Sequence, residues 1–159
     1  MEIKKKDLVI LANLRTNGRE SLTALSRKTR IPVSTIFDKI RAQEDSAIRK
    51  HTTLLNFEKL GFNSRAFVIL GIEKEHREKL REFLLTCPNI NSVLKINNGF
   101  NFMVEFIFRN MVDVENCIED IEERFNIKHK KVHYIIEDLK REGFLEDSDK
   151  IDVLFPGAY

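Results

Sequence analysis

The first third of the chain has the apolar spacing of short helices. Between positions 7 and 44, apolar residues recur three or four apart, which places their side chains on one face of an α-helix. The turn sequence Thr16-Asn17-Gly18 ends the first stretch, and Pro32 separates the second from the third. Helices this short are not stable alone, so we expect them to share one small core. Their succession is typical of a helix-turn-helix.

From residue 64 the apolar period changes to that of strands alternating with helices. Strand patterns occupy residues 65–72, 90–96, 100–108 and 131–137, and helical spacing separates the first two and the last two. The order βαββαβ is that of a ferredoxin-like unit, an antiparallel sheet with both helices on one face. We therefore predict an α+β fold, in which an N-terminal (winged) helix-turn-helix precedes a ferredoxin-like βαββαβ domain.

The second and third of these strands are joined by Asn97-Asn98-Gly99. Asn-Gly between two apolar runs is a strong hairpin signal, because a type I′ turn needs positive φ at both central residues. The sequence therefore predicts left-handed backbone at Asn98 and Gly99.

Two of the predicted strands are apolar at consecutive positions, over residues 66–70 and 102–104. The helices can cover only one face of the sheet, and the other face would be left as an exposed apolar patch. A second copy of the same sheet is the simplest cover, which predicts a two-fold homodimer. The pattern does not decide which sheet face forms the interface, for which we expect Phe67, Ile69, Phe102 and Val104.

Charge is unevenly distributed along the chain. Residues 1–63 carry 13 Lys and Arg against 7 Asp and Glu, and residues 64–159 carry 14 against 18. The basic part indicates a module that binds a polyanion. We expect a helix-turn-helix at 1–48, an extended wing or linker at 49–63, a dimerisation and effector domain at 64–140, and a C-terminal extension of unassigned role at 141–159.

Several classes of protein find no support in the sequence. No apolar run approaches the roughly 20 residues that span a bilayer, and the N-terminus lacks a signal-peptide pattern, so we expect a cytoplasmic protein. Cys87 and Cys117 fit reduced core thiols. His129 and His133 are too few for a metal site and fit a surface pair. No catalytic motif is present, so we expect neither an enzyme nor a cofactor.

Five short segments, in order and at the right spacing, resemble the leucine-responsive regulator/asparagine regulator (Lrp/AsnC, feast/famine) family of transcriptional regulators. They are Asn17-Gly18-Arg19, Leu25-Ser26-Arg27-Lys28, Ile36 with Lys39-Ile40-Arg41, Thr53-Leu54-Leu55-Asn56 and Asn98-Gly99-Phe100-Asn101-Phe102. The resemblance covers roughly residues 5–140. It implies a sequence-specific regulator that binds double-stranded DNA as a homodimer, with higher assembly such as four dimers in a ring.

The resemblance, together with the clustered basic residues, indicates where ligands bind. For DNA we expect contacts from Arg27, Lys28, Arg30, Ser34, Thr35, Asp38, Lys39, Arg41, Arg49 and Lys50. For a small-molecule effector the resemblance implies the hairpin, at Asn98, Gly99 and Asn101.

The chain departs from the family pattern at informative positions. Arg30 replaces the glycine of the turn, Pro32 replaces the usual capping serine, and Gln43 replaces a leucine. Asp38 replaces a basic residue of the recognition helix and weakens attraction to phosphate. Asn101 replaces an acidic residue that grips an amino group, so we expect no amino-acid effector or a weakly bound one.

Three alternatives remain open. The three-helix unit fits a protein-interaction module, and Asp38 fits a sensor or assembly protein that has lost DNA binding. Decarboxylases acting on sirohaem share the same two-domain architecture. This chain has only Ile48-Arg49-Lys50-His51 at the place of their basic motif, and it has no tryptophan.

Overall fold

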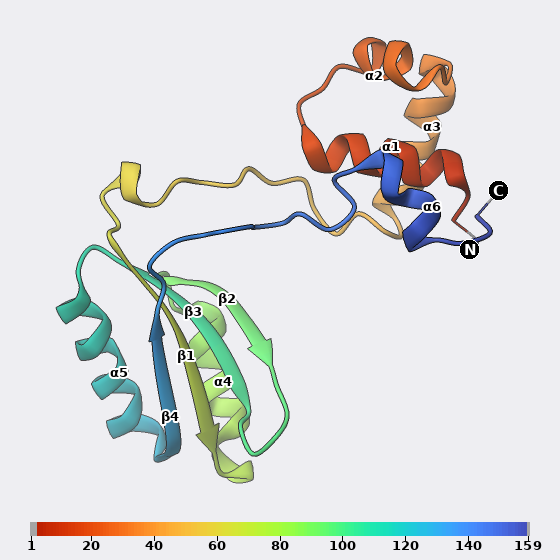
Figure 1. The fold of residues 1–159 in the computed structure, drawn as a ribbon. Coiled ribbons are helices and arrows are strands. Elements are labelled where there is room, and N and C mark those ends of the chain that lie inside the picture. The colour runs from red at the N-terminus through yellow and green to blue at the C-terminus, as the bar shows by residue number, and fades with distance from the viewer. Residues whose placement is uncertain (1–2, 159) are drawn as a thin grey trace. The chain divides into compact units, whose positions relative to one another are not determined.

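The computed structural model describes residues 3–158, which form two compact units (Figure 1). The helical unit combines the chain up to Leu54 with the chain from Leu139 onward. The sheet unit is Leu55–Asp138. The chain therefore passes from the helical unit into the sheet unit and then returns to the helical unit.

The helical unit contains α1 (Lys5–Thr16), α2 (Leu22–Thr29) and α3 (Val33–Glu44). Ser21 caps α2, its Oγ accepting a hydrogen bond from the Ala24 N–H at 3.1 Å. The three helices share one small cluster of buried residues, as the apolar spacing predicted: Ile10, Leu25, Ile31 and Ile36.

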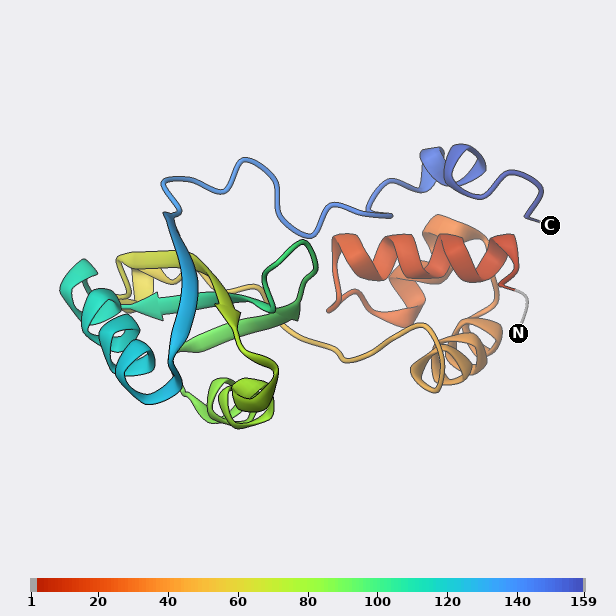
Figure 2. The same cartoon turned by 90° about the horizontal axis from the view of Figure 1, so that it is seen from below.

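The C-terminal segment completes the helical unit. It contains a 3₁₀ turn, η3 (Ser148–Lys150), and the one-turn helix α6 (Ile151–Leu154), which lies beside α1 in both views (Figures 1 and 2). Ile151 is 1% exposed and forms a second cluster with Leu8 and Ala12 of α1. The end of the chain is thus part of the structure that carries the helix-turn-helix.

Arg15 and Thr16, at the end of α1, hold the returning chain through polar contacts. The Arg15 guanidinium donates to the Phe144 carbonyl at 3.1 Å and pairs with the Glu142 carboxylate at 3.1 Å. The Thr16 hydroxyl donates to the Glu146 carbonyl at 2.8 Å. These bonds explain why a segment with little regular structure follows one course along α1.

The sheet unit has the predicted ferredoxin-like topology, with all neighbouring strands antiparallel in the order β2-β3-β1-β4. The strands are β1 (Ser64–Ile72), β2 (Ile90–Lys95), β3 (Phe102–Phe108) and β4 (Ile127–Tyr134), and the helices are α4 (Arg77–Thr86) and α5 (Met111–Phe125). Short 3₁₀ turns precede β1 (η1, Glu58–Leu60) and α4 (η2, Lys74–His76). The last strand begins four residues earlier than the pattern of 131–137 predicted.

Both helices cover one face of the sheet (Figure 2), and strand alternation decides which side chains lie beneath them. Val68 and Leu70 of β1 are buried there, as are Phe102 and Val104 of β3. The prediction that Phe102 and Val104 share an interface with Phe67 and Ile69 was therefore wrong. Phe67 and Ile69 alternate with the buried residues and lie on the other face, which we call the open face.

The hairpin between β2 and β3 has the predicted backbone, with φ of 64° at Asn98 and 86° at Gly99. The Asn101 side chain follows it and is part of the sheet, since its Oδ1 accepts a hydrogen bond from the Ile72 N–H at 2.7 Å. By contrast, residues 48–56 form no strand, so the possible wing within 49–63 is not a paired β-structure.

Candidate nucleic-acid interface

Helix α3 separates a buried side from an exposed side. Ile36 is fully buried in the helical core, and Gln43 is buried near the end of the helix. On the other side, Val33, Phe37 and Arg41 follow one another at four-residue intervals and form one exposed row. Exposed Ser34 and Asp38 form the next row, whereas Thr35 is half-buried between the two sides.

Exposed arginines lie on both sides of this surface in the sequence. Arg27 lies in the last turn of α2, and Arg30 ends α2 in the left-handed region at φ 58°. Arg41 lies in the last turn of α3, and Arg49 and Lys50 follow in the connecting segment. Their positive charge favours a polyanion over an uncharged partner.

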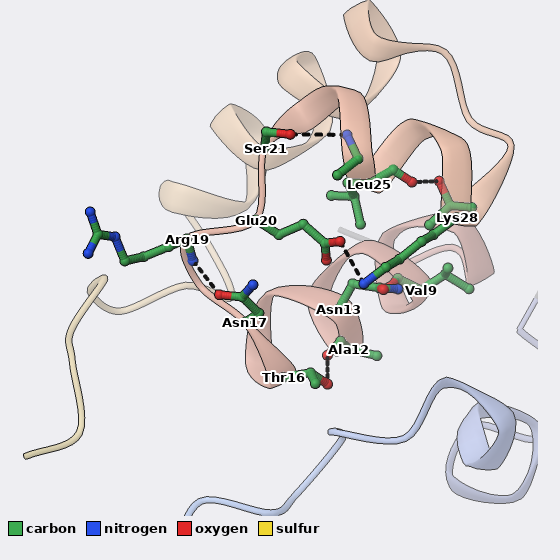
Figure 3. Close-up of polar contacts among 12 residues, drawn as sticks. Val9, Ala12, Asn13, Thr16, Asn17, Arg19, Glu20, Ser21, Leu25 and Lys28 are labelled. Carbon is green, nitrogen blue, oxygen red and sulfur yellow. Dashed lines mark hydrogen bonds and ion pairs between the residues drawn. The ribbon is translucent and has the colours of Figure 1, made fainter. Parts of the chain in front are cut away.

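Two of the lysines expected to contact DNA are held by buried carboxylates. Figure 3 shows Lys28 reaching Glu20, with Nζ and Oε1 2.6 Å apart and only 7% of the Glu20 side chain exposed. Lys39 likewise lies 2.6 Å from Asp7, whose side chain is 8% exposed. The first pair joins α2 to the turn before it, and the second joins α3 to α1. Both ammonium groups thus hold the helix-turn-helix together.

The turn between α1 and α2 is organised by side chains that the sequence already suggested. Asn17 Oδ1 accepts a hydrogen bond from the Arg19 N–H at 3.1 Å (Figure 3). This bond fixes the loop that brings Glu20 toward Lys28. Asn17, Gly18 and Arg19 were among the residues that resemble the family. In this structure Asn17 and Arg19 shape the turn through a side-chain to backbone hydrogen bond.

The open face of the sheet carries a polar network beside its apolar residues. Glu105 is 3% exposed, and its carboxylate accepts from Arg65 Nε at 2.7 Å, Asn91 Nδ2 at 2.6 Å and Ser92 Oγ at 2.8 Å. Arg65 also pairs with Asp138 at 2.6 Å. Burial alone raises the pKa of Glu105, but these donors outweigh it and hold the pKa below its ordinary value. Glu105 is therefore an ionised, fully bonded carboxylate.

The residues expected to bind an effector lie in and beside the hairpin between β2 and β3. Asn98 and Gly99 are exposed, and Asn101 is half-buried with its oxygen already bonded to the backbone. Phe100 packs edge-on against His129, with ring centroids 6.4 Å apart, and Lys131 lies 5.4 Å from the Phe100 ring centre. The polar side-chain groups of this turn are thus the neutral amides of Asn97, Asn98 and Asn101.

Other reactive side chains form no evident centre. Cys87 and Cys117 are free thiols, and burial, together with the neighbouring Cys87, raises the pKa of Cys117 to about 11. Within residues 3–158, no group of three or more His, Cys, Asp and Glu side chains is placed to hold a metal ion. Nor does any helix in this range have the length and apolar character needed to cross a membrane.

Comparison with known proteins finds relatives of this sequence and solved structures with this fold. No family model matches the sequence. The uncharacterized HTH-type transcriptional regulator PF1734 of Pyrococcus furiosus is 24% identical over 147 residues, which cover 92% of this chain and 99% of the relative. LrpC of Bacillus subtilis is 25% identical over 74% of this chain and 83% of its own. Its solved structure has a TM-score of 0.80 at 21% identity and covers 88% of this chain and 99% of that one.

The chain is similar in sequence to regulators of the Lrp/AsnC type and shares their fold. A second solved structure, the regulator NMB0573 of Neisseria meningitidis in complex with L-Met, has a TM-score of 0.78 at 20% identity, and it covers 85% of this chain and 90% of that one. The predicted fold is thus confirmed, and the resemblance seen in the sequence extends to relatives named as HTH-type transcriptional regulators. The residues expected at this surface did not include Val33 and Phe37, which are exposed on α3. Their four-residue spacing, repeated beside that of Ile36 and Ile40, was the available signal.

Proposed function

We propose that this protein is a sequence-specific DNA-binding transcriptional regulator that acts as a homodimer in the cytoplasm. The exposed side of α3, bordered by Arg27, Arg30 and Arg41, is the observation that carries the proposal. A short helix fits the major groove of B-DNA, and arginines beside it are suited to the phosphates. The relatives named as HTH-type transcriptional regulators support this function.

The phosphate contacts are assigned to the exposed arginines and Lys50 rather than to all the basic residues. Lys28 and Lys39 each have a carboxylate within 2.6 Å, so a phosphate must compete with Glu20 or Asp7 for them. Arg27, Arg30, Arg41, Arg49 and Lys50 are exposed and form the main phosphate-binding set. Ser34, Thr35 and Asp38, near the start of α3, are proposed to face the bases, because N-terminal residues of a recognition helix reach base edges.

The open face of the sheet is the proposed dimer interface. Phe67 and Ile69 lie half-buried on it, together with Met103 of β3. A two-fold axis through this face gives two recognition helices, which read successive major grooves about 34 Å apart. The DNA site is then a near-palindrome. Assembly of four dimers in a ring is a further proposal, which light scattering tests directly.

Binding to duplex DNA at several salt concentrations tests the proposed function. Fluorescence anisotropy with duplexes selected from random sequence should give affinity that falls steeply with salt, because bound arginines release counterions. Arg41→Ala should weaken binding to all duplexes and reduce the salt slope by about one. Arg77→Ala, an exposed arginine in α4, is the matched control and should change neither. Salt-independent binding, or equal effects of both variants, contradicts the proposal.

A small-molecule effector is proposed at the hairpin, at Asn98, Gly99 and Asn101. The neighbouring structure of NMB0573 contains L-Met, which supports an effector in this fold. Here Asn101 is neutral and its oxygen is engaged by Ile72, so an ammonium group gains no carboxylate partner. Calorimetry with common amino acids should show weak binding or none. Asn101→Asp keeps the oxygen that Ile72 needs and should strengthen binding. Micromolar binding by the unmodified protein contradicts this account.

One observation favours a second candidate function. The exposed carboxylate of Asp38 repels phosphate, as expected for an assembly protein that no longer binds DNA. In the selection experiment such a protein enriches no duplex at low salt. The sirohaem-decarboxylase alternative gains no support from the relatives, which are named as transcriptional regulators.

A further inference from the structure

The exposed side of α3 carries two large apolar side chains. Val33 is 42% exposed and Phe37 is 51% exposed, and the four-residue spacing places them one turn apart on the same row. A single exposed apolar residue is common on protein surfaces. Two adjacent ones at the start of the proposed recognition helix form a small apolar surface beside Ser34 and Asp38.

This apolar pair is not part of the helical core. That core is filled by Ile10, Leu25, Ile31 and Ile36, with Ile40 packed against it. Since Ile36 is fully buried and Phe37 is the next residue, the helix turns Phe37 about 100° away from the buried side. The pair is therefore available to a partner.

The charge around the pair indicates what that partner is. Arg41 continues the row one turn beyond Phe37, and exposed Arg30 lies in the turn that leads into α3, so basic residues flank the pair in the sequence. An apolar protein partner does not call for cations at both ends, whereas a DNA groove has phosphates along both edges. An exposed apolar pair with Arg41 on the same row and further arginines nearby in the sequence fits the major groove.

The major groove offers one apolar group. Guanine, cytosine and adenine present only hydrogen-bond donors and acceptors there, whereas thymine also presents its C5-methyl group. Val33 and Phe37 cannot donate or accept hydrogen bonds. We propose that Val33 and Phe37 contact thymine methyl groups and make this protein select thymine at the positions they face. The inference rests on the proposed DNA-binding function and adds the bases that are read.

Replacing thymine by deoxyuridine isolates this contact, because uracil keeps every hydrogen-bonding group and lacks only the methyl. The probe is the duplex selected by the unmodified protein, with each thymine replaced in turn. At the positions faced by Val33 and Phe37, uracil should weaken binding about fourfold per methyl, the effect of burying one carbon group. Other thymines should be insensitive.

Two variants tie the effect to these residues. In Phe37→Ala the penalty for uracil should vanish at one position, and in Val33→Ala at another, while affinity for the uracil duplex stays near that of the unmodified protein. Leu85→Ala, which alters an exposed leucine of α4 that is 59% exposed, is the matched control and should keep both penalties. Circular dichroism checks that each variant folds.

The outcomes distinguish failure of the thymine assignment from failure of DNA binding itself. If the unmodified protein binds thymine and uracil duplexes equally, the thymine assignment is overturned and the regulator function stands. If both variants keep the full penalty, other residues read the methyl groups and the assignment is also wrong. If the unmodified protein selects no duplex, DNA binding itself fails, and the apolar pair is a contact for another protein.

Discussion

The two units bury their apolar residues in different ways. The sheet unit has one continuous core, in which twelve buried residues of β1, β3, α4 and α5 pack together. The helical unit has two separate clusters, of four and three buried residues, and the smaller one depends on Ile151 from the end of the chain. The Lys39–Asp7 ion pair links α3 to α1, and the Lys28–Glu20 pair links α2 to the turn before it. The sheet unit is therefore stabilised by one large core, whereas the helical unit combines a small core, ion pairs and a contribution from the end of the chain.

The largest expected effect comes from making the same substitution in each unit. Ile151→Ala and Ile118→Ala both remove an isoleucine that is 1% exposed, and each should cost about 2–5 kcal/mol in its own unit. Ile151→Ala should release residues 148–158 from α1 and weaken DNA binding. Ile118→Ala should loosen α5 and the sheet. Hydrogen exchange by mass spectrometry resolves the two units.

This pair of variants also tests whether the units are independent. Protection lost in α4 and α5 on changing Ile151, or in α1 on changing Ile118, would show that the two cores unfold as one. The exposed position Val153, at 80% exposure, provides the control. Val153→Ala should leave both units unchanged.

A smaller effect should appear in how the stability of each unit depends on pH. The pKa of Glu105 is lowered in the folded sheet unit, so its ionised form stabilises the fold above its ordinary value of 4.5, and this contribution is lost as pH falls through the lowered pKa. Urea unfolding of the unmodified sheet unit should therefore become easier between about pH 5 and pH 3. Glu105→Gln should be less stable at neutral pH and should show a shallower decline.

The helical unit is the internal reference for that measurement. Glu105→Gln should leave its pH dependence unchanged, since Arg65, Asn91 and Ser92, the partners of Glu105, all belong to the sheet unit. An unchanged slope in the sheet unit would mean that other carboxylates control its acid sensitivity.

The smallest expected effect is in the helical unit, where one substitution should raise stability and weaken DNA binding. Arg30 adopts φ 58°, a conformation that costs an L-residue about 1–2 kcal/mol and glycine almost nothing. Arg30→Gly should raise thermal stability slightly, by about 0.5–1 kcal/mol after the extra chain entropy of glycine, and should weaken DNA binding. Asn126→Gly, at φ 45° in the sheet unit, is the matched change and should leave DNA affinity unaltered. If the Arg30→Gly variant binds DNA more tightly than the unmodified protein, Arg30 makes no favourable contact with DNA.

Features that depend on local spacing could be predicted from the sequence. The three helices, the βαββαβ order and the positive φ of Asn98 and Gly99 follow from periods and turn chemistry over a few residues. The face to which Phe102 and Val104 point could not be predicted in this way. A strand that is apolar on both faces carries no alternation, so only the packing of α4 and α5 decides it.

The candidate site was predicted only in part for the same reason. Its exposed arginines were recognised by charge, but the partners of Lys28 and Lys39 are Glu20 and Asp7, and the second of these lies 32 residues away in the sequence. Such pairs form only after the helices have packed. The course of the final residues along α1 was equally hidden, because Ile151 supplies just one buried side chain from a segment without a sustained period.

The return of the chain to the helical unit makes the sheet unit an insertion within it. A ribosome releases residues in order, and domains generally fold as units once their residues have emerged. The sheet unit is complete when Asp138 emerges, whereas the helical unit still lacks Ile151 and the residues that pack around it. The sheet unit therefore has all its residues before the helical unit does. The surface proposed for the dimer interface is thus complete in sequence before the helical unit, proposed to bind DNA, has its second cluster.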